Sequence, residues 1–234
     1  MAKPVSLVQI GTDQFIRPLK SEAKIIYKKM VEDKSMTPKG TLNWALDLEL
    51  KDQYLRSGFL FARKCTHDMF RITFQYKIMT QILPTNEFLQ RYRVQDSYVC
   101  LLCSERDTTL HRIYECGRIL DFIGAVFSFL NDNCGTSLNI DESMEDYIFG
   151  LQGNHEALNQ ILLELKVFNF YTIQESPHIA NDVFLTRFFT RIKRIILREK
   201  SISLFGNKYD EFEYKWSKYV SIYDFRGPDV DFIT

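Results

Sequence analysis

Seventeen residues near the middle of the chain place the strongest constraint on what it can fold into. The stretch CLLCSERDTTLHRIYEC holds three of the five cysteines and one of the four histidines of the 234-residue sequence. Two cysteines three positions apart can present both thiolates to one ion, and a second ligand pair after a loop completes a tetrahedral shell. The ligands expected from the C-x2-C-x7-H-x4-C spacing are Cys100, Cys103, His111 and Cys116. This spacing predicts one structural Zn2+, whose closed shell leaves no position open for catalysis.

The second ligand pair carries a geometric condition. Five residues of an ideal α-helix rotate by about 500°, which leaves the side chains of His111 and Cys116 about 140° apart. Both cannot lie on one regular helix face. The spacing therefore predicts that the pair straddles a helix end, with the chain uncoiling between the two residues. A zinc ion can enforce this conformation, because structural zinc sites contribute on the order of 10 kcal/mol.

Two other interpretations of the cysteines stay open. A Cys-x-x-Cys redox pair normally begins a helix after a βα unit, and no such unit is visible here. Buried cysteines beside an unrelated surface histidine would also fit the composition. We favour zinc because four ligand-type residues follow one another at ligand-like spacing. Cys65, His67 and Cys134 lack such a pattern and are interpreted as packing or surface residues.

Composition indicates a globular protein that does not enter a membrane. The chain is 45% hydrophobic and 26% charged, and no apolar run approaches the roughly 20 residues of a spanning helix. The first twenty residues lack the apolar core of a secretory signal, so we expect an intracellular protein of the cytoplasm or nucleus. In a reducing compartment, clustered cysteines hold metal more often than disulfides. The net charge of +0 means that any nucleic acid would need a local basic patch.

The hydrophobic pattern predicts a mainly α-helical fold with one small zinc-organised knot. Residues 1–40 are expected to be a partly ordered lead-in with a short helix near Ser21–Met30. Residues 41–134 form a helical region with the zinc motif, and residues 135–234 form a helical region with a basic helix and an irregular tail. No strand alternation is long enough for a sheet, and no solenoid repeat occurs.

Individual helices follow from apolar spacing and capping residues. Thr85 and Asn181 are predicted N-caps, and a last helix should carry Phe212 and Trp216. The other helices expected from apolar periodicity are Met69–Leu83, Ile119–Leu130, Asn154–Ile173 and Asn181–Ser201.

The helix after Asn181 carries two opposed faces. Its arginines fall within about 60° of arc at 100° per residue, and its apolar residues lie about 160° away. The arginines are Arg187, Arg191, Arg194 and Arg198, and the apolar residues are Leu185, Phe189, Ile192 and Ile196. The guanidinium fork suits phosphate, so the first row is a candidate nucleic-acid contact. The alternative is a solvated face held by salt bridges to neighbours.

A second basic run precedes the cysteines. Its candidate nucleic-acid contacts are Lys77, Arg91 and Arg93, with further cations at Arg56, Arg63, Lys64 and Arg71. The interleaved tyrosines Tyr76, Tyr92 and Tyr98 could stack on unpaired bases. More commonly, tyrosines at such spacing belong to a core and turn their hydroxyl outward.

The motif and its flanks also resemble a known family. The features that carry the resemblance are Trp44 to Leu48, the QYKI stretch Gln75 to Ile78, Pro84-Thr85, the cysteine pair, the TTLH step Thr108 to His111, and Cys116. Together with the helix-like flanks, they resemble the zinc-binding region of reverse transcriptases of non-LTR retrotransposons of the long-interspersed-element type. The similarity covers roughly residues 42 to 219.

This resemblance implies a nucleic-acid-binding C-terminal module of such a polyprotein. Its partners would be RNA, target DNA or both, and the reverse transcriptase core of the same element, with no small-molecule substrate. The family's polymerase centre needs an aspartate pair after an aromatic residue, and no Tyr/Phe-x-Asp-Asp occurs in this chain. We therefore expect no enzymatic activity. The alternative is a zinc-stabilised helical scaffold for protein interactions, domesticated from an element or a relic of one.

Overall fold

The computed structural model of the protein describes residues 8–9, 15–16, 39–48, 52–173 and 179–223. The chain divides into two compact units, Met1–Lys39 and Gly40–Thr234. In the first unit, strands β1 (Val8–Gln9) and β2 (Phe15–Ile16) form one short antiparallel pair. The helix expected near Ser21–Met30 lies outside the described residues.

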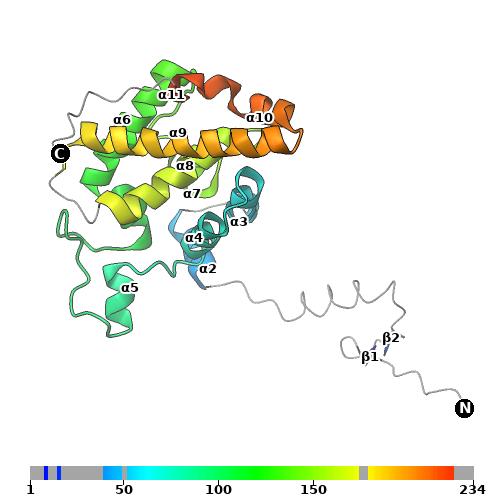
Figure 1. Ribbon diagram of the computed structural model, residues 1–234. Helices are drawn as coiled ribbons and strands as arrows, with labels where there is room; N and C mark the ends of the chain where they lie inside the picture. Colours follow the sequence, from blue (N-terminus) through cyan, green and yellow to red (C-terminus); the bar gives the residue numbers. More distant parts are fainter. Residues whose placement is uncertain (1–7, 10–14, 17–38, 49–51, 174–178, 224–234) are drawn as a thin grey trace, which may run out of the picture. The chain divides into compact units, whose positions relative to one another are not determined.

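The second unit is built from helices, which confirms the mainly α-helical fold (Figure 1). An isolated bridge between Val99 and Arg106 is the one strand-like pairing of its described residues. The short turns are the π-helical η1 (His111–Glu115) and η2 (Asn169–Ile173) and the 3-10 turn η3 (Ser217–Tyr219). The helices are α2 (Lys39–Asp47), α3 (Asp52–Cys65), α4 (Met69–Met79), α5 (Asn86–Arg91), α6 (Gly117–Cys134), α7 (Met144–Phe149), α8 (Glu156–Phe168), α9 (Asn181–Phe205), α10 (Tyr209–Trp216) and α11 (Val220–Tyr223).

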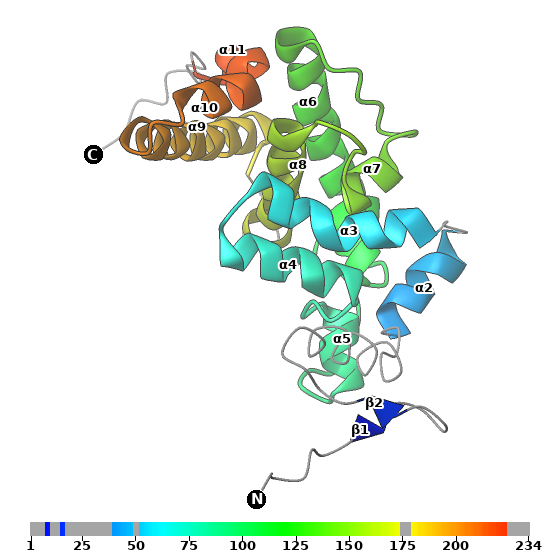
Figure 2. The same cartoon turned by 90° about the vertical axis from the view of Figure 1, so that its right-hand side faces the viewer.

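Helix α8 lies at the centre of this unit. Each of its residues from Ala157 to Phe168 is buried, and the helix contacts α3, α4, α9 and α10. Helices α3 and α4 pack on one side of it, and α9 crosses α6 with α10 and α11 beside it (Figures 1 and 2). Helices from both expected regions, 41–134 and 135–234, therefore share one core.

Capping residues explain where several helices begin and end. The Thr85 hydroxyl accepts the N–H of Phe88, which confirms its predicted role as the N-cap of α5. The predicted helix Ile119–Leu130 extends to Cys134 and stops at Gly135, whose φ of 61° lies in the left-handed region.

Some predicted boundaries are wrong. Helix α4 ends at Met79 rather than Leu83, because the Ile82 N–H turns back to the carbonyl of Lys77 and Gln81 takes a left-handed φ of 52°. The helix expected over Asn154–Ile173 begins at Glu156 and widens into the π turn η2. Asn181 is already helical and makes no cap, since Ala180 occupies the extended cap position.

Helix α9 also runs four residues past the expected Ser201, because no helix-breaking residue occurs before Gly206. The last helix predicted from Phe212 and Trp216 is confirmed as α10, and both side chains are buried. Among the described helices, none combines the length and the apolar character needed to traverse a bilayer.

Candidate metal centre

The four predicted ligands come together between α5 and α6. One ligand atom from each of Cys100, Cys103, His111 and Cys116 lies within 4.8 Å of all the others. The His111 Nε2 atom is 3.2 Å from the Cys103 Sγ atom, which is 3.8 Å from the Cys116 Sγ atom. Cys103 is exposed and the other three residues are buried. This arrangement could hold a metal ion, and its residues are the ones that the spacing predicts.

The first pair is shaped by a tight turn. The Cys100 N–H donates to the carbonyl of Glu105 at 2.7 Å, and the Ser104 N–H donates to the carbonyl of Cys100 at 2.9 Å. Ser104 adopts a left-handed φ of 65°, which reverses the chain after Cys103. The Leu102 N–H donates to the Cys100 sulfur at 3.4 Å. The turn thus aims both sulfurs at one point.

The second pair is brought together by the π turn η1. The Cys116 N–H donates to the carbonyl of His111 at 3.0 Å, which is the i to i+5 bond of a π turn. This turn holds more residues than the 3.6 of an α turn, so Cys116 returns towards the side of His111. Cys116 then leaves helical conformation, with a ψ of 125°, before α6 begins. The predicted break at a helix end is confirmed, whereas uncoiling between the ligands is wrong.

A buried ion pair holds the loop between α5 and η1, which carries the first two candidate ligands, against α5. Asp107 has no exposed surface, and Arg112 donates to it through Nε at 2.9 Å and through a second guanidinium nitrogen. The Asn86 N–H at the start of α5 also donates to Asp107, at 2.7 Å. Arg112 further donates to the Pro84 carbonyl. This pair was not predicted, because in the sequence both residues look like ordinary surface charges beside the motif.

The sulfurs also influence one another's ionisation. A hydrogen bond from Cys116 lowers the pKa of the Cys100 thiol well below its usual value, and the same bond raises the pKa of Cys116. Thiolates are the form in which cysteines bind metals. A cation at this cluster would be closed in by three sulfurs and one imidazole, leaving a four-coordinate ion no position for a substrate.

The remaining cysteines belong to the core. Cys65 is buried at the end of α3, and desolvation raises the pKa of its thiol to about 12. Cys134 is buried at the end of α6, with its sulfur 3.3 Å from the Ser221 hydroxyl. Neither residue joins the metal cluster among the described residues.

The arginine row of α9 is divided by the structure. Phe189, Ile192 and Ile196 are buried on the opposite face, and Leu185 is half-buried. Arg191 is half-buried and forms an ion pair with Glu164 of α8 at 2.9 Å. Three arginines of the row are exposed and form no ion pair with a described residue: Arg187, Arg194 and Arg198.

The other candidate contacts are scattered. Lys77 is half-buried on α4, and Arg91 is exposed but forms an ion pair with Glu87 at 3.0 Å. Arg93 is exposed and takes a left-handed φ of 58° just after α5. The structure does not join these three cations with the α9 row.

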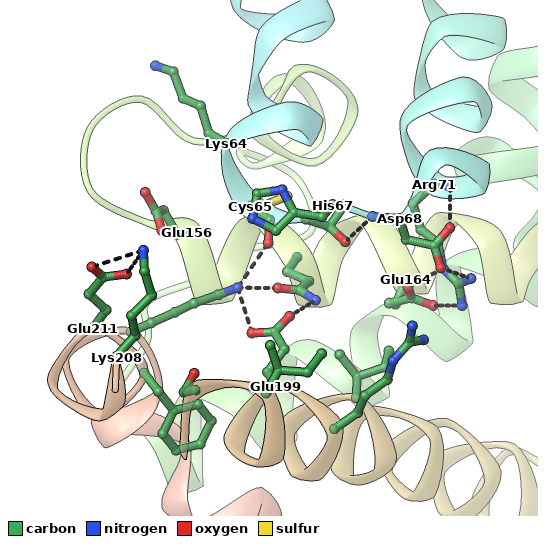
Figure 3. A pocket seen from close by; sticks show the side chains of 18 of the residues that line it. Lys64, Cys65, His67, Asp68, Arg71, Glu156, Glu164, Glu199, Lys208 and Glu211 are labelled. Carbon is green, nitrogen blue, oxygen red and sulfur yellow. Dashed lines mark hydrogen bonds and ion pairs between the residues drawn. The ribbon is translucent and has the colours of Figure 1, made fainter. Parts of the chain in front are cut away.

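A groove of about 700 Å3 separates the α3–α4 connection from α9 and α10, with α8 at its floor (Figure 3). Lys215 reaches into it and donates to Glu199 at 2.9 Å, to Gln160 at 2.5 Å and to the carbonyl of Cys65 at 2.9 Å. Glu164 lies further along and accepts from Arg71 at 2.6 Å. This network was not predicted from the sequence, although a glutamate among the apolar residues of α8 was a sign that buried partners exist.

Comparison with protein-family models and with curated proteins finds no match to this chain.

Proposed function

We propose that the protein is a nucleic-acid-binding, zinc-stabilised C-terminal module of a non-LTR retrotransposon reverse transcriptase. It grips RNA or DNA and performs no chemistry itself, while a polymerase core of the same element acts on the bound strand. The observation that carries the proposal is the row of exposed arginines on α9. Arg187, Arg194 and Arg198 lie on a 25-residue helix whose opposite face is buried, so their backbone positions are fixed.

The arginine row and the metal centre have different roles: the arginines contact phosphate, and the metal stabilises the fold. Each arginine that contacts a phosphate displaces condensed counterions, so affinity should depend steeply on salt. Three thiolates and one imidazole form the ligand set that structural zinc commonly takes, and zinc is the metal that we assign to the cluster. The role of the zinc is to hold the conformation of the chain between α5 and α6. A small segment rich in turns has too few core contacts to hold that conformation by itself.

The decisive experiment is a salt titration of binding to RNA and to duplex DNA. The test variant is Arg194→Glu with Arg198→Glu, which leaves the structural Arg191 intact. The matched control, Lys208→Glu with Lys218→Glu, makes the same change in net charge at exposed positions near α10. We expect the test variant to lose affinity and to lower the slope of log K against log salt by about 1 to 2, at about 0.9 for each duplex phosphate contact. Equal binding by both variants, or no binding by the wild type at low salt, would refute the proposal.

A protein-interaction scaffold is the second candidate, and the apolar end of α9 favours it. Phe205 is 93% exposed, with Ile202 and Leu204 more than half exposed beside it. Apolar side chains gathered at one helix end are more typical of protein contacts than of phosphate contacts. This function would gain support if the protein bound no nucleic acid and Phe205→Asp abolished a measured association with a reverse transcriptase core.

A further inference from the structure

Helices α3 and α4 form a helical hairpin. Three residues connect the two helices, which lie side by side (Figure 2). We define the hairpin face as Arg56, Phe59 and Arg63 of α3 with Tyr76 and Lys77 of α4. The α3 residues recur at spacings of three and four, so they share one side of that helix.

The cations of the hairpin face have no ion pair with a residue whose side chain the structure describes. Arg56 and Arg63 are exposed and Lys77 is half-buried, and none forms an ion pair with a described residue. The single acidic residue between Tyr54 and Met79 is Asp68, which accepts from Arg71 and caps α4. Three cations that form no ion pair with a described residue favour a polyanionic partner.

The hairpin face also holds an aromatic pair. Tyr76 is 51% exposed, and its ring centroid lies 5.9 Å from that of the half-buried Phe59. The contact with Phe59 supports one side of the Tyr76 ring and restricts its motion, so less conformational entropy is lost when a ligand binds. An exposed ring within a cationic surface is the arrangement on which unpaired bases stack. Duplex bases cannot use it, because their faces are covered by neighbouring base pairs.

We propose that the hairpin face binds single-stranded nucleic acid. An unpaired base stacks on Tyr76, while Arg56, Arg63 and Lys77 contact the flanking phosphates. This inference rests on the proposed function and adds to it a preference that the α9 arginines do not confer, because phosphate contacts alone do not distinguish single strands from duplexes.

The test measures binding of the full zinc-loaded chain to a labelled 20-nucleotide single strand and to a duplex of the same sequence. Stacking contributes about 1–3 kcal/mol per base, so Tyr76→Ala should weaken single-strand binding about 5- to 150-fold. Its affinity for the duplex should not change, and Tyr76→Phe should retain wild-type binding because it keeps the ring. Tyr214→Ala is the matched control, since Tyr214 is 77% exposed and belongs to α10 rather than to the hairpin.

The outcomes separate this inference from the proposal on which it rests. Wild-type single-strand binding by Tyr76→Ala, with reduced binding by the α9 variant, would overturn the hairpin site alone. Equal losses on single strand and duplex in Tyr76→Ala would also overturn it, because stacking would not be the cause. Binding to phosphatidylserine vesicles that depends on Tyr76, without single-strand binding, would assign the face to a membrane surface instead.

Discussion

Lys166 of α8 gives the most quantitative prediction. Its side chain has no exposed surface, and its Nζ atom donates to Gln75 Oε1 at 2.8 Å and to the carbonyl of Ile148 at 3.0 Å. No carboxylate of a described residue pairs with the amine, and desolvation lowers the pKa of Lys166 from 10.5 to about 7. The rings of Phe61 and Tyr147, at 4.6 and 5.7 Å, favour the charged form and offset part of the desolvation cost.

The buried lysine makes the free energy of unfolding depend on pH, because the folded and unfolded chains bind different numbers of protons. Between pH 7 and 10.5 the unfolded chain holds a proton on this lysine that the folded chain has released, so the free energy of unfolding rises with pH. Each tenfold change in proton affinity corresponds to about 1.4 kcal/mol, so the free energy of unfolding can rise by at most about 5 kcal/mol over this whole pH range. The rise between pH 7 and 8.5 should be about 1.5 kcal/mol. Higher pH is unsuitable, because unfolded cysteines ionise there whereas burial raises the pKa of Cys65 to about 12.

Lys166→Met tests this reasoning, because methionine fills a similar volume without a charge. In urea unfolding followed by circular dichroism, the wild type should show a rise of about 1.5 kcal/mol between pH 7 and 8.5, to within a factor of two, and the variant should lack it. It leaves Gln75 Oε1 without its donor, at about 1–3 kcal/mol, but removes a larger penalty, so it should be at least as stable as the wild type at pH 7. Lys218→Met, at an exposed position, is the control. Parallel profiles of wild type and Lys166→Met would refute a buried, neutralised lysine.

Other perturbations have expected outcomes of the same kind. Elemental analysis should find one zinc per chain, and Cys103→Ser should lower both the zinc content and the thermal midpoint; a metal-free wild type would contradict the proposed centre. Arg112→Met leaves Asp107 as a buried, unpaired carboxylate and should cost about 3–5 kcal/mol in urea unfolding, whereas a loss below 1 kcal/mol would show that the pair is not buried in solution. Gly150→Ala should destabilise by about 1–3 kcal/mol, since φ is 84° and the added Cβ would lie 2.6 Å from the Phe61 ring; an unchanged urea midpoint would count against this backbone conformation.

Helix identity was readable from the chain wherever one face stays apolar. The stripes of α6 and α9 predicted both helices, since their buried residues recur at the helical period. The ends were harder, because caps depend on single hydrogen bonds. Thr85 makes its bond and Asn181 does not, although both residue types favour caps.

The ligand set needed nothing beyond the sequence, because tetrahedral metal sites limit which cysteine and histidine spacings can meet at one ion. Cys100, Cys103, His111 and Cys116 do meet in the fold. The π turn that brings His111 back towards Cys116 was not predictable, since nothing in HRIYE distinguishes it from an α turn.

Whether a charged side chain is buried, paired or exposed was decided by the tertiary structure alone. By helical period, Arg191 is equivalent to Arg187, Arg194 and Arg198, yet among these four only Arg191 pairs with Glu164, a residue 27 positions away on α8. Likewise Lys166 looks like a surface lysine until α3, α4 and α7 enclose it. Sequence determines which residues share a helix face, because that depends on local geometry. Whether a charge on that face meets water or a partner depends on segments distant in the chain, and only the packed fold brings those together.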